Sequence, residues 1–394
     1  MTVRILALNA GSSSLKFAVF RADVSQPILK VTGQVESLTT RPHLILKSAA
    51  HETLENRLFP EDAERTHEGA LQHILETLES HFPGVSIDAV GHRIVHGGPD
   101  FAEPLLLNEE VIKKLEELIP LAPLHQPHNL LAIAASHVAF PDAVQVGCFD
   151  TAFHRSHPWV NDTFALPRAY YEKGVRRYGF HGLSYEYVSA KLREIAPEIA
   201  SGRVVIAHLG AGASMWGIKG GVSVASTMGF SALDGLPMAT RCGQIDPAVI
   251  LYLLDHERMT SRQIAEMLYK DCGLYGLSGL SGDMRELEAA GTPEAEQAID
   301  YFVFRIRREL GGLAAALNGL DAMVFCGGIG ENAVRIRQRI CEGLHWIGLD
   351  LDDGRNQRNE GLISSDTAGA KIFVINTDEG AMIARHTLDL LVSR

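Results

Sequence analysis

The sequence VRILALNAGSSSLKFAVF, residues 3–20, contains an apolar strand, a turn of small polar residues and a second apolar strand. A helix pattern does not follow the turn, so the segment is not a P-loop. Gly and Ser in the turn offer backbone N–H groups and hydroxyls that can close around a phosphate, and Lys16 adds a positive charge. The stretch therefore predicts a hairpin that holds nucleotide phosphates, with an ordinary tight hairpin as the alternative.

A second segment of the same plan begins half the chain later. Residues 203–208 form an apolar run, residues 210–213 read Gly-Ala-Gly-Ala, and residues 214–218 resume the strand pattern. Two domains of one topology, each offering a hairpin to a shared cleft, would explain the repetition. The alternative is coincidence, because hairpins with Gly-rich turns are common.

Length and composition limit the class of protein. A chain of 394 residues is too long for one core and predicts two domains, and 46% hydrophobic with 21% charged residues is typical of globular proteins. The net charge of −12 argues against nucleic acid or an anionic membrane as partner. Five dispersed cysteines predict a protein without disulfides or a zinc site. Together with the lack of a long apolar segment and of a signal-peptide pattern, they predict a cytoplasmic protein.

Periodicity and capping residues predict the remaining elements. Asn108 is expected to cap a helix that ends near residue 118, and Ser184 one that ends near 195. A buried helix is predicted over 128–140. Further strands are predicted over 85–95, 143–149, 222–226, 322–326 and 371–375, and further helices over 66–81, from 247, over 293–318, from 333 and over 378–391.

Several polar residues stand where chemistry is expected. Gly327–Asn332 lies between a strand and a helix, which suits a nucleotide, but its spacing is not that of a Rossmann fold. Arg93 is expected in a glycine-bracketed turn, residues 91–98, and Arg241 occurs in the segment 239–243; both suit a carboxylate or phosphate. His181 is a catalytic or a packing histidine. Asp150, at a strand end, is a metal ligand, a base or a helix cap. Such loops suit Mg²⁺ bridged to phosphates.

Nine motifs in order resemble the acetate kinase family: LNAGSSSLKF (8–17), GHRIVHGG (91–98), CFDTAFH (148–154), RYGFHGLS (177–184), HLGAGAS (208–214), MGFSALDGLPMATRCGQIDP (228–247), LSGDMRE (280–286), GGIGEN (327–332) and TDEGAMIA (377–384). The resemblance implies reversible phosphoryl transfer between ATP and acetate, giving acetyl phosphate and ADP, with Mg²⁺ or Mn²⁺. It also implies a homodimer.

The resemblance further implies an α/β fold of the actin-like class, with two domains, a duplicated βββαβαβα core and an interdomain cleft. The first domain is expected to span residues 1–150 and to be completed by a C-terminal helix at about 378–394. Residues 151–377 are expected to form the second domain, which carries the nucleotide-binding loops.

The site residues that the resemblance implies fall into four groups. The catalytic group is Arg93, Asp150, His181 and Arg241. The acetate-binding group is Arg93, Val95, Leu124 and Ala232. The ATP-binding group is Lys16, His208, Leu209, Gly210, Ala211, Gly212, Asp283, Met284, Arg285, Gly328, Ile329, Gly330, Glu331 and Asn332, with Ser12 and Ser14 in a phosphate loop. The metal group is Asn9 and Glu379.

The chemistry of the acceptor limits what Asp150 can do. A carboxylate is already ionised at neutral pH, since its pKa lies near about 4 to 5, and as a nucleophile it needs no general base. Asp150 is therefore expected to orient an arginine or a metal-bound water. The transferring phosphoryl group needs positive charge around it, which two arginines, a histidine and Mg²⁺ would supply.

Four positions depart from the usual family pattern. Ala211 replaces Asn in the HLGAGAS motif, Ala232 replaces Pro beside the small-acid pocket, Tyr185 replaces His, and TDEG (377–380) replaces Thr-Asn-Glu-Glu. Ala232 opens space for a substrate one methylene longer, which predicts improved turnover of propionate. The alternatives to a small-carboxylate kinase are an actin- or chaperone-like ATPase switch and an inactive nucleotide-binding relative.

Overall fold

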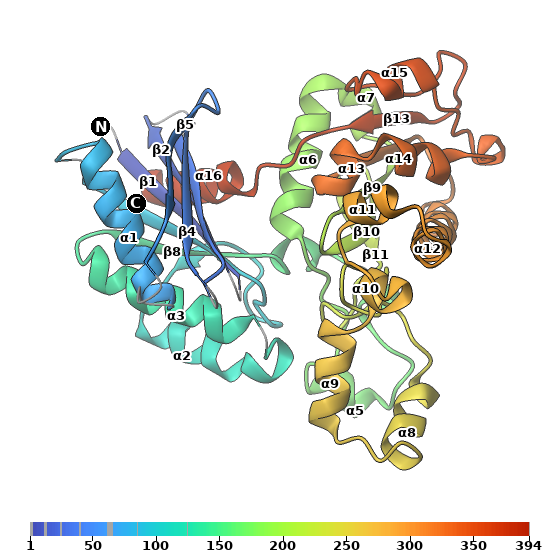
Figure 1. Cartoon of the computed structure of the whole chain (residues 1–394), viewed down its shortest axis with the longest axis horizontal. Coiled ribbons are helices and arrows are strands. Elements are labelled where there is room, and N and C mark those ends of the chain that lie inside the picture. The colour runs from blue at the N-terminus through green and yellow to red at the C-terminus, as the bar shows by residue number, and fades with distance from the viewer. Residues whose placement is uncertain are drawn as a thin grey trace. The chain divides into compact units, whose positions relative to one another are not determined.

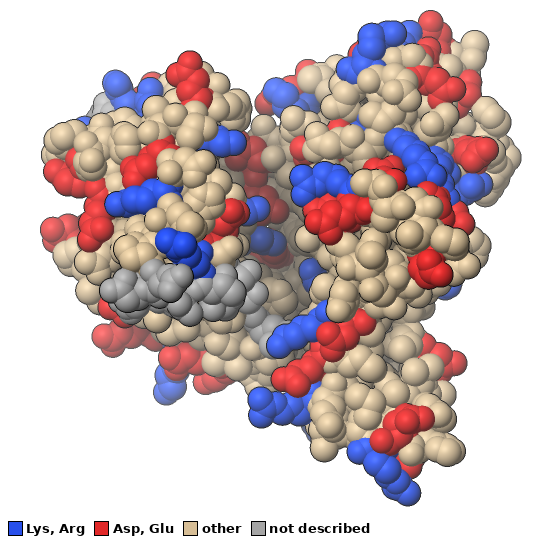
Figure 2. Space-filling view, in the orientation of Figure 1, with Lys and Arg blue, Asp and Glu red and all other residues tan. Residues whose placement is uncertain are grey.

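The structure is a computed structural model that describes residues 3–11, 14–23, 26–38, 41–60, 66–84, 86–123 and 125–393. It divides into two compact units (Figure 1). Unit 1 comprises Met1–Phe153 and Asp378–Arg394, and unit 2 comprises His154–Thr377. Across the described residues, no helix is long and apolar enough to cross a membrane. Acidic and basic side chains are interspersed on the face shown in Figure 2.

Unit 1 contains an eight-stranded sheet in the order β5-β4-β3-β2-β1-β6-β8-β7. The first hairpin is as predicted, because β1 and β2 pair antiparallel with Asn9 opposite Lys16. β1 also pairs parallel with β6, and β6 pairs parallel with β8. The strands are β1 (Val3–Ala10), β2 (Leu15–Ala22), β3 (Pro27–Glu36), β4 (His43–Ser48), β5 (Thr53–Leu58), β6 (Ala89–Ile94), β7 (Leu105–Leu106) and β8 (Val144–Phe149).

The unit 1 helices cover both faces of its sheet. The helices are α1 (His67–His81), α2 (Glu109–Glu117), α3 (Gln126–Ala139) and α16 (Glu379–Val392). Leu6, Leu8 and Val19 form a core with Leu71 and Ile74 of α1. α16 packs on the opposite face, where a Cβ on Gly91 would meet Ile383 and Thr387.

The helix capped by Asn108 is as predicted, because the Asn108 side chain accepts a hydrogen bond from the N–H of Val111. The prediction of a buried helix over 128–140 is only half right. Leu131 is 56% exposed and Val138 is 77% exposed, whereas Ala132 and Ile133 are buried. α3 packs against the sheet through one face, so its apolar residues on the other face remain exposed.

Unit 2 contains a five-stranded sheet in the order β11-β10-β9-β12-β13. The strands are β9 (Arg203–Leu209), β10 (Ala213–Lys219), β11 (Val222–Ser226), β12 (Ala322–Cys326) and β13 (Lys371–Val374). Its first three strands pair antiparallel and its last three pair parallel, as in β3-β2-β1-β6-β8 of unit 1. The predicted duplication of the core is therefore confirmed.

The unit 2 helices include two corrections to the sequence predictions. The helix capped in sequence by Ser184 begins earlier, at Gly182, because His181 adopts a left-handed conformation at its N-cap with φ of 59°. Gly327–Asn332 is itself a short helix and not a loop. The helices are α4 (Trp159–Asp162), α5 (Arg168–Glu172), α6 (Gly182–Ile195), α7 (Pro197–Ala200), α8 (Pro247–Asp255), α9 (Ser261–Lys270), α10 (Gly273–Ser278), α11 (Met284–Ala290), α12 (Pro293–Leu317), α13 (Gly327–Asn332), α14 (Val334–Cys341) and α15 (Asp353–Gln357).

Candidate active site

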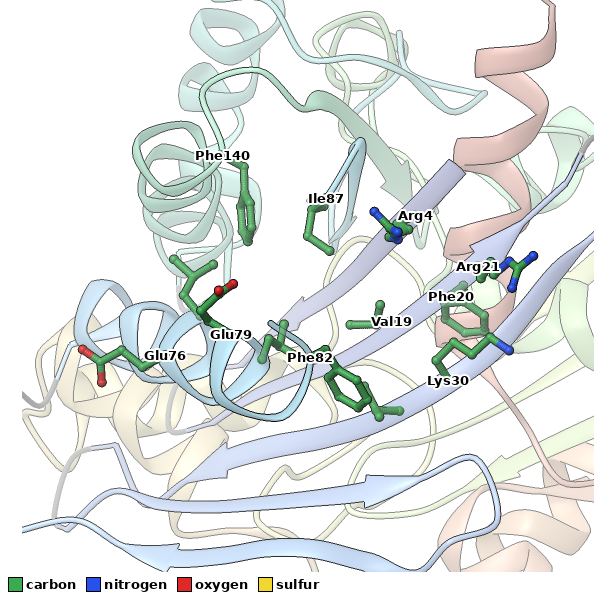
Figure 3. A pocket seen from close by; sticks show the side chains of 13 residues that line it. Arg4, Val19, Phe20, Arg21, Lys30, Glu76, Glu79, Phe82, Ile87 and Phe140 are labelled. Carbon is green, nitrogen blue, oxygen red and sulfur yellow. The ribbon is translucent and has the colours of Figure 1, made fainter. Parts of the chain in front are cut away.

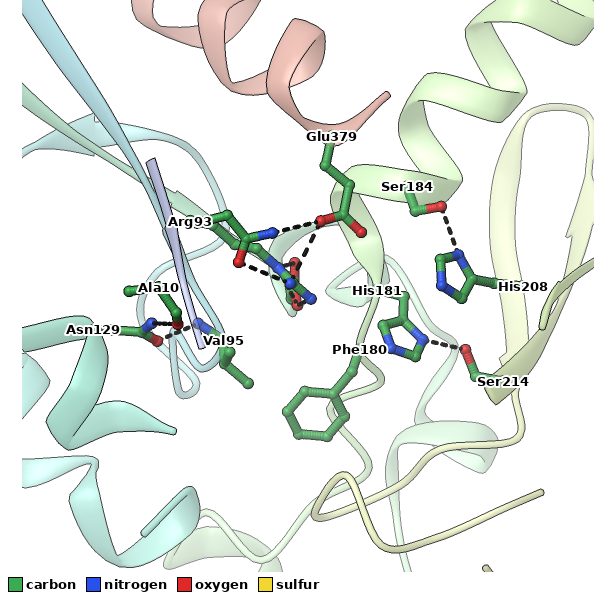
Figure 4. A network of polar contacts seen from close by, with 12 residues as sticks. Ala10, Arg93, Val95, Asn129, Phe180, His181, Ser184, His208, Ser214 and Glu379 are labelled. Atoms are coloured by element: carbon green, nitrogen blue, oxygen red, sulfur yellow. Dashed lines mark hydrogen bonds and ion pairs between the residues drawn. The ribbon is translucent and has the colours of Figure 1, made fainter. Parts of the chain in front are cut away.

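Arg93 is the centre of a charged cluster in unit 1 (Figure 4). It lies inside strand β6, near its end, and not in the turn predicted for it, because residues 89–94 pair with β8. Asp150 directly follows this neighbouring parallel strand. The Arg93 Nε lies 3.1 Å from both Asp150 carboxylate oxygens, and Nη2 lies 2.6 Å from Oδ2. Two neighbouring parallel strands thus place this pair at one edge of the sheet, where they end together.

Burial and the neighbouring carboxylates act in opposite directions on the charge of Arg93. Asp150 is 1% exposed, so an unpaired carboxylate here would be costly. Burial disfavours the Arg93 charge, but the Asp150 and Glu379 carboxylates outweigh that effect and raise the pKa of the Arg93 guanidinium. Arg93 therefore remains a cation whose orientation Asp150 sets.

Asn9 and Glu379 complete the unit 1 cluster. The Arg93 Nη1 donates to the Asn9 Oδ1 at 3.1 Å and lies 3.4 Å from the Glu379 Oε2. The Asn9 amide nitrogen in turn donates to the Glu379 Oε2 at 3.1 Å. Both residues present hard oxygen atoms close together, and Mg²⁺ commonly uses one or two such protein ligands, with water and phosphate oxygens completing the shell. The pair fits Mg²⁺ in donor chemistry.

Buried polar residues fix the ends of β1 and β6 beside this cluster. The Asn129 side chain donates to the Ala10 carbonyl at 3.1 Å and accepts from the Val95 N–H at 3.0 Å. The His67 Nε2 lies 2.7 Å from the Gly11 carbonyl oxygen, and the Gly11 N–H donates to the Ser14 carbonyl. The β1–β2 turn is therefore anchored from α1 and α3. Two predicted site residues, Ser12 and Leu124, lie outside the described residues.

His181 and Arg241 converge on one glycine in unit 2. An added Cβ on Gly212 would lie 3.0 Å from the Arg241 Nη2 and 3.1 Å from the His181 Nε2. Gly212 belongs to the turn between β9 and β10, in which the Gly210 N–H donates to the Gly212 carbonyl. The absence of a side chain at Gly212 leaves room for both groups, which places an imidazole and a guanidinium against the same stretch of backbone.

A chain of hydroxyls holds His181 in place. Its Nδ1 lies 2.8 Å from the Ser214 Oγ, which lies 2.5 Å from the Tyr185 hydroxyl. Figure 4 shows the His181 contact with Ser214 and, beside it, the contact of His208 with Ser184. The His208 Nδ1 lies 2.8 Å from the Ser184 Oγ, and the two imidazole rings stack with centroids 4.4 Å apart. With Nδ1 engaged, the Nε2 of His181 is the atom directed at the Gly212 turn.

Ala232 positions Arg241 through its backbone. The Arg241 Nη1 donates to the Ala232 carbonyl at 2.8 Å, and Ala232 is 7% exposed. The Ala211 carbonyl likewise accepts a hydrogen bond from the Ala239 N–H at 3.1 Å. The two departures from the family pattern, Ala211 and Ala232, are thus both connected by hydrogen bonds to the Arg241 segment, and their carbonyls do not depend on which side chain stands there.

Helix α13 follows β12, next to the β9–β10 turn. The Glu331 Oε1 accepts from the Gly327 N–H at 2.9 Å and from the Thr377 N–H at 3.0 Å. Gly327 has φ of 76°, and a Cβ there would lie 2.7 Å from the Leu209 carbonyl oxygen, so only glycine allows this close approach. Glu331 therefore anchors the helix through its carboxylate, while Gly328, Ile329, Gly330 and Asn332 make up the rest of α13.

Arg337 holds the other end of α13 and was missed by sequence reasoning. It is fully buried, and its Nη1 donates to the carbonyls of Gly330 and Glu331, both at 2.9 Å. Its Nε donates to the Asn356 Oδ1 at 2.8 Å. A buried arginine held by carbonyls cannot be distinguished in sequence from the exposed arginines of the same amphipathic helix.

The Asp283–Arg285 segment lies at the start of α11. The Asp283 side chain accepts from the Arg285 N–H, and its carboxylate also pairs with the Arg285 guanidinium at 2.5 Å. The Arg285 hydrogen bonds lower the pKa of Asp283 to about 2. The Arg285 side chain is 88% exposed, so this pair contributes little to stability and remains available to a ligand.

Sequence reasoning missed several other residues that support the site. They are His67, Asn129, Ser184, Ser214 and Thr377. Asn129 and Ser214 carry a weak signal, since each is a polar residue inside an apolar helix or strand pattern. The partners of such residues come from segments far away in sequence, so their roles follow only from the fold.

Comparison with known proteins identifies the family. The sequence model of the acetokinase family matches residues 4–385. The acetate kinase of Methylocella silvestris is 54% identical over 399 residues, which cover 98% of this chain and 98% of the relative. The crystal structure of Porphyromonas gingivalis acetate kinase matches with a TM-score of 0.87 at 37% identity, covering 99% of this chain and 100% of that chain.

A propionate kinase from Francisella tularensis subsp. tularensis matches the structure equally well. Its TM-score is 0.91 at 35% identity, covering 98% of this chain and 99% of that chain. These matches, which extend over nearly the whole chain, agree with the nine motifs and with the duplicated sheet. The chain therefore belongs to the acetokinase family of phosphotransferases, whose acceptor is a carboxyl group.

Proposed function

We propose that the protein transfers the γ-phosphoryl group of ATP to acetate, and back, giving acetyl phosphate and ADP. An acetate oxygen forms the new bond to phosphorus while the bond to the ADP oxygen breaks, in line and without a covalent enzyme intermediate. The observation that carries the proposal is the convergence of His181 and Arg241 on Gly212. Membership of the acetokinase family supports the proposal. The convergence of His181 and Arg241 favours a kinase over a partner-switching ATPase.

Unit 2 is assigned the nucleotide. Neutralising charge on the equatorial oxygens of the transferring group is the main catalytic task in phosphoryl transfer. Arg241 is a permanent cation, and the His181 Nε2 can donate a hydrogen bond to the same group. The segments proposed to bind ATP are residues 208–212, 283–285 and 328–332, with Lys16 of unit 1 adding a contact to a phosphate.

Unit 1 is assigned the acceptor. Arg93 would hold the acetate carboxylate, with Val95 beside the acyl group. Contacts within the described residues engage the Arg93 Nε, one side of Nη2, and Nη1. The remaining N–H on Nη2 can bind an acetate oxygen while Asp150 keeps the guanidinium in place. Asp150 is thus proposed as a positioning residue that moves no proton.

Mg²⁺ is proposed to be held by Asn9 and Glu379, whose oxygen atoms lie together beside Arg93. When bound, the metal ion would neutralise charge on the phosphate oxygens. The same oxygens hold the Nη1 of Arg93 in the described arrangement. Asn9 and Glu379 therefore orient Arg93 when they do not bind the metal.

The experiment that tests the function is a hydroxamate assay for acyl phosphate with MgATP and acetate. Saturable formation of acetyl hydroxamate is expected, and Arg241→Ala should abolish most of it. ATP hydrolysis without acyl phosphate would contradict the kinase and support the ATPase switch. We also propose a cytoplasmic location, on the dispersed cysteines, and a homodimer, which only the family resemblance supports. Light scattering of the purified protein would measure the mass of the assembly.

Propionate is the second candidate acceptor. Ala232 stands where the family commonly has Pro, and one of the matched structures is titled a propionate kinase. One methylene is worth about 1–3 kcal/mol of selectivity in an apolar pocket. Ala232→Pro is therefore expected to lower kcat/KM for propionate relative to acetate by roughly fivefold or more. An unchanged ratio would show that Ala232 does not set the size of the acyl site.

A further inference from the structure

Unit 1 contains a pocket of about 540 Å³ at one end of its core (Figure 3). Its walls include Val19 and Val31 of the sheet, and Leu78, Phe82 and Phe140 of the α1 and α3 regions. Val19, Val31 and Leu78 are buried members of the core, and Phe82 and Phe140 are half-buried residues packed against it. A volume of this size accommodates a small organic ligand.

Three cations surround one side of this pocket. Figure 3 shows Arg4, Arg21 and Lys30 gathered there, with Glu76 on the opposite side. Arg4 and Arg21 are direct partners in the β1–β2 register. Two like charges directly opposite each other on neighbouring strands are destabilising, so this pairing is unfavourable unless an anion lies between them.

A β-bulge adds the third cation. Val19 pairs with Val31 and Phe20 pairs with Leu29, so Lys30 has no partner on β2. Bulges are enriched near functional sites, because they redirect one side chain and interrupt the ladder. Within the described residues, Arg4, Arg21 and Lys30 form no ion pair, and the only side-chain hydrogen bond of Arg4 is to Ser86 at 3.2 Å.

The acidic residues around the pocket are already engaged locally. The Glu79 Oε1 accepts from the Gly84 N–H at 3.1 Å. The Glu76 carboxylate accepts from Gln72 at 3.2 Å and lies 3.5 Å from His73. The lining holds three cations and two carboxylates, a formal net charge of +1, and the cations lie together on one side of the apolar cavity.

We propose that this pocket binds an amphipathic carboxylate, with its aliphatic chain among the core residues and its carboxylate among Arg4, Arg21 and Lys30. The site is separate from the catalytic cluster of unit 1, since the two share no residue. The inference goes beyond the proposed function, because a medium-chain acid is bound here and not phosphorylated. Three cations beside an apolar cavity suit this head group and chain together.

The test is calorimetric titration of the full-length protein with hexanoate, octanoate and decanoate. Each methylene buried in the cavity should tighten Kd by about fourfold. The double variant Arg21→Gln/Lys30→Gln should weaken decanoate binding by roughly threefold to thirtyfold, given the usual strength of exposed charge pairs. Lys47→Gln/Lys113→Gln removes the same charge from positions that do not line the pocket and should leave Kd unchanged.

Two further measurements separate this site from the catalytic one. Leu75→Trp would fill the pocket from α1 and is expected to abolish decanoate binding while circular dichroism and hydroxamate activity stay at wild-type levels. Saturating acetate with MgATP should not displace decanoate. The proposal fails if decanoate does not saturate, if both double variants bind it equally, or if acetate competes with it.

Discussion

The two units share a strand order, but different kinds of group hold the candidate catalytic residues in each. In unit 1, Arg93 is held by the carboxylates of Asp150 and Glu379. In unit 2, Arg241 is held by a carbonyl and His181 by a hydroxyl, and both meet at a glycine. A permanently ion-paired cation suits the orientation of a small acceptor. A guanidinium and an imidazole placed against one turn suit hydrogen bonding to an anionic ligand.

The two hairpin turns also differ in their residues and in the groups that contact them. Residues 11–14 connect β1 and β2 with Gly and Ser, whereas residues 210–212 connect β9 and β10 with two glycines and Ala211. The first turn is anchored from outside by His67. The second is surrounded by the catalytic candidates themselves. The same place in the two sheets is thus occupied by turns with different residues and different neighbours.

The largest expected effect comes from removing the unit 2 cation. Arg241→Ala should lower kcat by about a thousandfold, since arginines that stabilise a transferring phosphoryl group contribute at least this much. The hydroxamate assay measures it. Arg262→Ala, at a side chain that is 88% exposed in α9, is the matched control and should leave kcat unchanged. A loss below tenfold for Arg241→Ala would place the catalytic charge elsewhere.

The next prediction tests whether Asp150 acts only by positioning Arg93. Asp150→Asn keeps the shape but loses the charge that orients Arg93, and kcat/KM for acetate should fall roughly a hundredfold. The acidic limb of the pH–rate profile should remain where it is, because no proton moves through Asp150. Disappearance of that limb in the variant would show instead that Asp150 titrates during turnover.

A smaller effect is expected from crowding the unit 2 turn. Gly212→Ala places a methyl group about 3 Å from the Arg241 Nη2 and the His181 Nε2, so both side chains must shift. A shift of this kind should lower kcat by roughly tenfold to thirtyfold with the protein folded. Gly311→Ala in α12, where an added Cβ meets nothing within 4 Å, is the control. Equal kcat in both variants would mean that neither group acts at Gly212.

The smallest effect concerns stability in acid. Burial lowers the pKa of His92 in unit 1 and of His154 in unit 2, each from 6.5 to about 4. Between pH 6.5 and pH 4 the unfolded chain binds more protons than the folded chain. The contribution of each histidine to the free energy of unfolding is therefore complete above pH 6.5 and is lost as the pH falls toward 4. At pH 5 each histidine should cost about 2 kcal/mol of unfolding free energy relative to pH 8.

Urea titrations at pH 8 and pH 5 measure this loss. His92→Gln should remove only the His92 part of the pH dependence, because a glutamine at that position does not titrate. His128, His154 and His157, whose pKa values burial also lowers, should keep their parts. His256→Gln, at an exposed position, is the control and should not alter the pH dependence. An unchanged pH dependence in His92→Gln would mean that His92 is not a buried neutral histidine.

Local signals in the sequence were enough for most elements. Asn108 caps its helix as predicted, and Asp246 and Thr292 cap the helices predicted from residues 247 and 293, because a capping residue acts on N–H groups two or three positions away. Ser184 has the same chemistry, but its side chain contacts His208 and Thr377, and His181 begins the helix instead. Where a distant partner competes for a polar side chain, the local rule fails.

The sequence by itself determined the paired strands, the glycine turns and the identity of the charged residues, since these depend on spacing and side-chain chemistry. Only the tertiary structure decided that Asp150 occupies the side of Arg93 and that His181 and Arg241 share Gly212. Each of these contacts joins segments that are distant in the chain. Strand register and packing create them, and neither is written in any single stretch of sequence.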